Sequence, residues 1–173
     1  MAAREFEVPA PDARLLWLVP GVALALAIVG AGLASREQPR IAMFAVPVVL
    51  AVIALLWVSL TRRRVRLHDG TLEVVAGLNS RRVPVADIDL AQARIVDLDE
   101  HGELRPGLKT FGTSTPGYHA GHFRMRDGKP AFVLLTGRQR VLLLPVRDGK
   151  RLLLSLAQPQ ALLDALAGQQ RHR

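Results

Sequence analysis

The stretch RVRLHDGTLEVVA, residues 64–76, decides the fold of the larger part of this chain. Val65 and Leu67 alternate with basic or polar side chains, which is the pattern of a strand with one buried face. The Asp69–Gly70 pair then supplies the positive φ angles of a tight turn before a second apolar run begins. The stretch therefore predicts a β-hairpin and, around it, a mainly-β domain.

Two further Asp–Gly pairs, which are also typical of tight turns, follow later in the chain at Asp127–Gly128 and Asp148–Gly149. Short apolar runs lie between them, and each run is typical of a strand. The run Phe132–Leu135 is apolar on both faces, so it requires cover on both sides. The expected strands are 65–68, 71–76, 82–88, 94–98, 122–126, 131–136, 140–146 and 151–156.

One helix is predicted after the last strand. Pro159 stands in its first turn, Leu162 and Leu166 fall on one stripe, and Gly168 follows as a stop signal. We expect this helix, residues 158–167, to cover the sheet as a lid, with a short tail at 169–173.

Two apolar stretches, 15–34 and 41–60, precede this domain and are separated by a polar break. A helix of about 20 apolar residues, rising 1.5 Å per residue, crosses the ~30 Å hydrocarbon core of a bilayer. The sequence therefore predicts a transmembrane hairpin at 15–60, preceded by an N-terminal tail at 1–14. For the first stretch a cleaved signal peptide is the alternative, because small residues precede Ser35.

The charges that flank these stretches predict their orientation. Arginines are more numerous on the side of the two termini, which indicates a multi-pass protein of a bacterial inner membrane with both termini in the cytoplasm. Tryptophans near the same interface are typical membrane anchors. The lipid bilayer is thus an expected partner. The residues expected at the membrane surface are Trp17, Trp57, Arg62, Arg63, Arg64 and Arg66.

Composition excludes several kinds of site. The chain has no cysteine, which removes disulfides, thiolate catalysis and Cys-bound zinc. The net charge is +8, but the basic residues after the apolar stretches alternate with acidic ones, unlike a nucleic-acid surface. His119 and His122 are three residues apart without an evident third ligand. We expect no nucleic-acid partner, no metal and no cofactor.

The stretch 102–121 is rich in glycine and lacks a strand pattern, so we expect a long loop there. Loops of this length are often functional, and basic and hydroxyl side chains can gather in one around an anion. The alternative is an ordinary strand connection in which the glycines supply turn geometry. The candidate ligand-binding residues are Arg105, Lys109, Thr110, Tyr118 and His119.

The order of elements, together with four short motifs, resembles the bacterial PH-like (pleckstrin-homology-like) membrane proteins. The motifs are RVP at 82–84, GLKTFG at 107–112, PGYHAGHF at 116–123 and LLLS at 152–155. The resemblance implies a PH-like antiparallel β-barrel or sandwich at 61–168, capped by the C-terminal helix. It also implies a binding or scaffolding role, and no catalytic residue carries over.

The function predicted from these observations is a non-enzymatic, membrane-anchored PH-like module at the cytoplasmic face. Its expected partner is a protein of unknown identity or a second copy of the chain. The alternative is a small membrane enzyme or accessory subunit that acts on a lipid headgroup through residues 102–121, with His119 as proton carrier. That alternative lacks the paired carboxylates, nucleophile or metal set that such chemistry needs.

Overall fold

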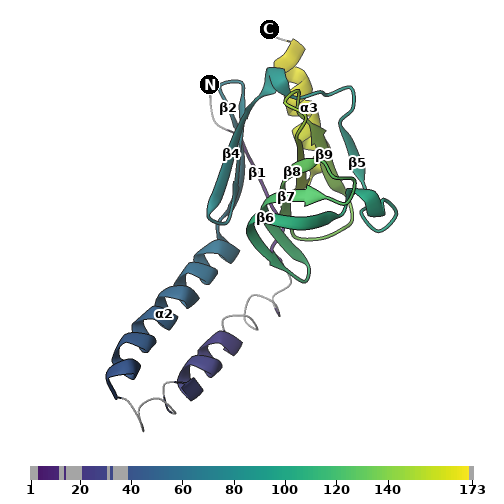
Figure 1. Cartoon of the computed structure of the whole chain (residues 1–173). Coiled ribbons are helices and arrows are strands. Elements are labelled where there is room, and N and C mark those ends of the chain that lie inside the picture. Colours follow the sequence, from purple (N-terminus) through teal and green to yellow (C-terminus); the bar gives the residue numbers. More distant parts are fainter. Residues whose placement is uncertain (1–3, 12–13, 15–20, 31, 33–38, 172–173) are drawn as a thin grey trace. The chain divides into compact units, whose positions relative to one another are not determined.

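The computed structural model describes residues 4–11, 14, 21–30, 32 and 39–171. The chain divides into two compact units. One consists of residues 1–11 together with 62–173, and the other consists of residues 12–61. Strands dominate the first unit and helices the second (Figure 1).

The helical unit does not support the predicted transmembrane hairpin at 15–60. Residues 21–30 are helical, and α2 covers Pro39–Thr61 with Pro47 inside it. Residues 15–20, 31, 33 and 34 of the first predicted span lie outside the described residues. Counted over the described residues, no helix is both long and apolar enough to cross a membrane. The predicted transmembrane helices, 15–34 and 41–60, and the predicted multi-pass membrane location are therefore wrong.

The first sheet of the β unit has four antiparallel strands in the order β1-β2-β3-β4. The predicted β2–β3 hairpin is confirmed, and its turn has positive φ at both Asp69 (44°) and Gly70 (70°). Val65 and Leu72 are fully buried on its inner face. The strands are β1 (Arg4–Phe6), β2 (Arg63–His68), β3 (Thr71–Ala76) and β4 (Asn79–Pro84).

The N-terminal segment, expected as a tail, contributes β1 to this sheet. Phe6 pairs with Val65 of β2, and its side chain is only 7% exposed. The backbone carbonyl of Glu7 also accepts a hydrogen bond from the Ala157 N–H, 3.0 Å away. Three residues are too few for a sequence pattern to reveal, so this strand depends on contacts with residues about 60 positions away.

The second sheet has six strands in the order β5-β9-β10-β8-β7-β6. The chain folds back so that β10 lies between β9 and β8, antiparallel to the first and parallel to the second. The predicted all-antiparallel barrel is therefore wrong at this pair. The strands are β5 (Arg94–Val96), β6 (Pro106–Thr115), β7 (Tyr118–Met125), β8 (Pro130–Leu135), β9 (Val141–Pro145) and β10 (Arg151–Ser155).

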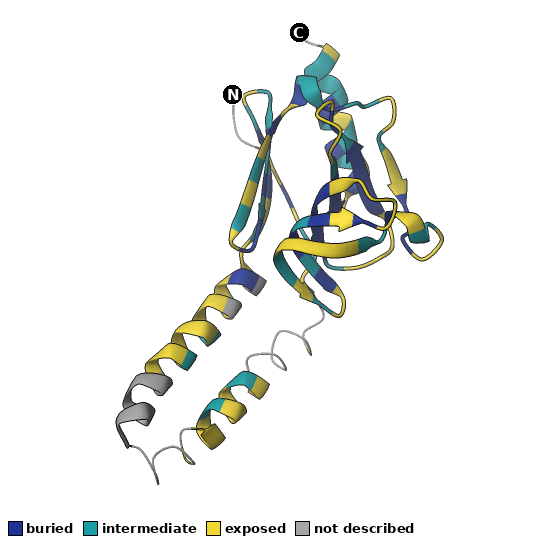
Figure 2. Ribbon diagram, viewed as in Figure 1, coloured by how far each residue is buried: buried dark blue, intermediate teal, exposed yellow. Residues whose placement is uncertain are grey.

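The central strands of this sheet are buried on both faces, as their uniformly apolar sequences require (Figure 2). Side chains alternate along a strand, so Val133 and Leu153 lie on one face, where Leu98 and Leu104 from the β5–β6 connection cover them. Phe132 on the other face is also fully buried. The two sheets contact each other through β3 and β8 and through β4 and β7.

The predicted C-terminal helix is confirmed as α3 (Pro159–Arg171), with Leu162 and Leu166 fully buried. It continues past Gly168 because its last turn has a tertiary anchor. The Gln170 amide donates hydrogen bonds to the carbonyls of Val85 (2.8 Å) and Ile88 (3.0 Å). Val85 belongs to the short 3-10 helix η1 (Val85–Asp87), and a second one, η2 (Gly102–Leu104), precedes β6.

Candidate functional site

The stretch 102–121 is mostly a β-hairpin and not the long loop predicted from its glycines. After η2 the chain enters β6, turns at Pro116–Gly117 and returns in β7. The pairing of β6 with β7 shifts register between Pro106 and Leu108 and again between Lys109 and Phe111. Each shift inserts an extra residue as in a β-bulge, which breaks the alternation that sequence reasoning relies on.

This hairpin separates the five predicted ligand-binding residues. Lys109 and Thr110 are exposed on β6, whereas Tyr118 is fully buried in the core. Burial raises the pKa of Tyr118 to about 12, although the positive charge of Arg63 opposes the rise. Because neighbouring strand residues point to opposite faces, Tyr118 and His119 cannot act on the same side of the sheet. The five residues therefore do not form one site.

Arg105 and His119 are the two predicted residues that do line a common pocket. The Arg105 guanidinium donates to the carbonyl of Leu98 (2.6 Å) and to the Asp99 carboxylate (2.9 Å). His119 is half-buried, and its Nδ1 lies 2.9 Å from the Ser114 hydroxyl oxygen. Burial, with the nearby charge of Arg138, lowers the pKa of His119, so its ring is neutral at pH 7.

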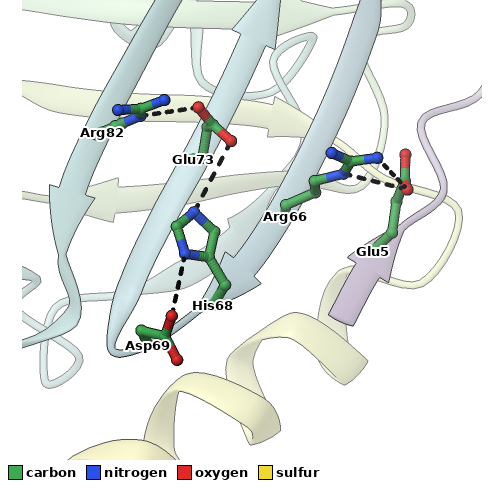
Figure 3. A network of polar contacts seen from close by, with 6 residues as sticks. All are labelled: Glu5, Arg66, His68, Asp69, Glu73 and Arg82. Carbon is green, nitrogen blue, oxygen red and sulfur yellow. Dashed lines mark hydrogen bonds and ion pairs between the residues drawn. The ribbon is translucent and has the colours of Figure 1, made fainter. Parts of the chain in front are cut away.

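The arginines expected at a membrane surface belong to β2 or precede it. Arg64 and Arg66 both form ion pairs with Glu5 of β1, at 2.9 and 3.2 Å. The pair between Arg66 and Glu5 is drawn in Figure 3. The Arg62 carbonyl accepts a hydrogen bond from the Gly77 N–H at 2.7 Å. Arg63 is half-buried in β2, and Trp57 is 37% exposed on α2, whereas Trp17 lies outside the described residues.

The outer face of the four-stranded sheet carries a network of paired charges (Figure 3). Arg82 donates to Glu73 at 2.8 Å, and His68 lies 3.8 Å from the same carboxylate. The hydrogen bond from Arg82 is the main reason that the pKa of Glu73 is lowered, and desolvation opposes it. These carboxylates are already neutralised by neighbours on the same sheet, so this face offers little to a charged ligand.

The outer edge of β6 differs from that face. Leu108 and Phe111 are 72% and 66% exposed, more than any other large apolar side chain described in this unit. β6 ends the strand order, and no other described strand bonds to its outer edge. Sequence reasoning missed this feature, although two large apolar residues beside glycines in GLKTFG, 107–112, were a visible signal.

One protein family matches this chain when it is compared with known proteins. A family model described as a bacterial PH domain matches residues 63–170, which includes every strand of the β unit except β1 and nearly all of α3. No curated protein and no solved structure matches the chain.

Proposed function

The chain belongs to the bacterial PH domain family, and on that premise we propose that it is a non-enzymatic binding module for a protein partner. The proposed contact is the outer edge of β6, where a partner segment in extended conformation adds a strand to the six-stranded sheet. The observation that carries the proposal is the pair of exposed side chains, Leu108 and Phe111, on the strand that ends the described sheet.

Two physical effects favour this surface over the rest of the unit. An edge strand presents unpaired backbone N–H and C=O groups, which an added strand satisfies. Covering Leu108 and Phe111 fully stabilises a complex by about 1.5–3 kcal/mol for each side chain. Lys109 lies between them, and Arg124 pairs with Leu108 across the hairpin, so acidic residues in the partner are favoured.

The non-enzymatic part of the proposal is supported by what the polar groups of the hairpin already do. Tyr118 is inside the core, Arg105 is held by Leu98 and Asp99, and His119 is bonded to Ser114. General acid–base chemistry needs such groups to converge on one reacting atom. Here they are distributed over two faces of a sheet.

The experiment selects displayed random peptides of ten residues, the length of β6, against the full chain. Amide hydrogen exchange then locates the bound peptide. We expect protection of the β6 amides and at least about tenfold weaker binding by the Leu108→Ser/Phe111→Ser double variant. Leu78→Ser/Ile95→Ser, which changes two exposed apolar residues elsewhere in the unit, is the matched control and should bind normally.

Three outcomes would overturn the proposal. They are the absence of any selected binder, protection confined to other strands, and equal weakening by the two double variants. A dimer of the full chain that disappears in the Leu108→Ser/Phe111→Ser variant would assign the edge to a second copy instead of a different protein.

A further inference from the structure

The pocket that holds Arg105 and His119 is lined by residues from three connections that are distant in sequence. Its volume is about 210 Å³. Arg105 precedes β6, Arg126 lies in the β7–β8 turn, and Arg138 lies in the β8–β9 turn. Leu98 and Leu135 supply an apolar wall. Leu108 and Phe111 are not part of the lining, so the pocket is independent of the proposed partner edge.

The charges around this pocket are not balanced. Asp99 forms ion pairs with Arg105 (2.9 Å) and with Arg138 (3.3 Å) through the same carboxylate oxygen. Among the described residues no carboxylate lies within ion-pair distance of Arg126. Three guanidinium groups and one carboxylate leave a local charge of 3 − 1 = +2.

His119 adds hydrogen-bonding capacity without adding charge. Its ring is neutral at pH 7, as argued above from its burial and the nearby guanidinium. A neutral imidazole offers one donor and one acceptor. The pocket thus combines fixed positive charge with a neutral polar side chain and an apolar wall.

We propose that this pocket binds a phosphate monoester, with the phosphate among the three guanidinium groups and the organic part against Leu98 and Leu135. Guanidinium forks match the oxygens of phosphate and form short, charge-assisted hydrogen bonds. A phosphate monoester carries about −1.5 to −2 charges at pH 7, which offsets the local charge of the pocket. A carboxylate carries a single negative charge, which is less than the charge of the monoester.

The test is calorimetric titration of the full chain with phenyl phosphate, a monoester with a compact apolar body. Benzoate, which has the same ring but one charge, should bind at least about tenfold more weakly. Arg126→Gln should weaken the binding of phenyl phosphate at least about tenfold, because it removes charge-assisted hydrogen bonds. Arg124→Gln is the matched control, since it removes the same charge from an exposed arginine that does not line the pocket.

A second experiment, with lipid vesicles, distinguishes a lipid headgroup from a free phosphate ester as the ligand. Binding to vesicles that contain phosphatidic acid, lost in Arg126→Gln and absent for phosphatidylcholine alone, would support a lipid source. Binding of phenyl phosphate without binding to either vesicle would support a free ester. Equal weakening by Arg126→Gln and Arg124→Gln, benzoate binding as tight as phenyl phosphate, or no binding in either arm would overturn the proposal.

Circular dichroism checks that the Arg126→Gln variant is folded. Arg126 is exposed and its guanidinium has no ion-pair partner among the described residues, so the spectrum should match that of the unchanged chain. Arg126→Lys keeps the positive charge but loses the planar guanidinium fork. It should bind phenyl phosphate more weakly than the unchanged chain and more tightly than Arg126→Gln.

Discussion

Gly112 and Gly121 stand directly opposite each other in the β6–β7 hairpin, where the two backbones approach too closely for any side chain. A Cβ atom on Gly112 would overlap the carbonyl oxygen of Ala120, and one on Gly121 would overlap that of Phe111. Both residues also have positive φ, 148° and 120°. The exposed edge of β6 therefore depends on this pair of glycines.

We expect Gly112→Ala to lower the free energy of unfolding by at least about 2 kcal/mol, because overlap and backbone strain both add to its cost. Urea denaturation of the full chain measures the change. Gly102→Ala is the control, since a Cβ there meets nothing within 4 Å, and its effect should stay within about 0.5 kcal/mol. Similar values for the two variants would contradict the close approach.

The N-terminal strand β1 should be held by Phe6 more than by its ion pairs. Phe6→Ala removes a buried aromatic side chain and is expected to cost about 3 kcal/mol. Glu5→Ala breaks pairs with Arg64 and Arg66 that are half exposed, and should cost less than about 1 kcal/mol. Urea denaturation measures both, and the reverse ranking would show that electrostatics holds the strand.

Tyr118 is the sole tyrosine of the chain, so the ultraviolet absorbance of phenolate reports its ionisation alone. Burial raises its pKa to about 12 in the folded state, so no phenolate should form near pH 10. Because the folded pKa is raised, this group stabilises the fold below pH 10 and loses that contribution as the pH rises toward 12. Phenolate forming near pH 10 with an unchanged circular dichroism spectrum would refute the burial of this side chain.

Asp127 should make stability depend on acidic pH. Desolvation raises the pKa of this carboxyl, but hydrogen bonds from the Lys129 N–H and the Arg151 guanidinium outweigh it and leave the pKa below its ordinary value of 3.8. A lowered folded pKa stabilises the protein above pH 3.8, and this stabilisation is lost as the pH falls through the folded value.

The Asp127→Asn variant tests this dependence. It should be less stable than the unchanged chain at pH 7, and the difference should shrink as the pH falls below 3.8. Urea midpoints measured across this range check the expectation. A difference that stays constant with pH would mean that the carboxylate charge contributes nothing.

Several elements of the fold were predictable because their signals are local. The alternation around Val65 and the Asp69–Gly70 turn identify the β2–β3 hairpin within a dozen residues. The apolar stripe of Leu162 and Leu166 identifies α3 in the same way. The family resemblance, which predicted a PH-like domain at 61–168, agrees with the family match at 63–170.

The candidate sites were predictable only in part. Arg105 and His119 were selected for their chemistry, and they do line one pocket. Tyr118 was selected from the same stretch but belongs to the core, because the hairpin turns it to the opposite face from His119. The bulges of β6 break the alternation of that strand, so the two faces of β6 were not distinguishable in the sequence.

Local sequence periodicity thus specified most strands of this chain, β1 and β6 excepted, and where its last helix forms, because a strand or helix buries its own repeating apolar positions. Tertiary structure alone decided that β10 lies between β9 and β8 and that β1 pairs with β2. It also decided that Arg126 and Arg138 line the same pocket as Arg105. These relationships join residues far apart along the chain. Their free energy comes from packing and charge between neighbours that exist only once the chain has folded.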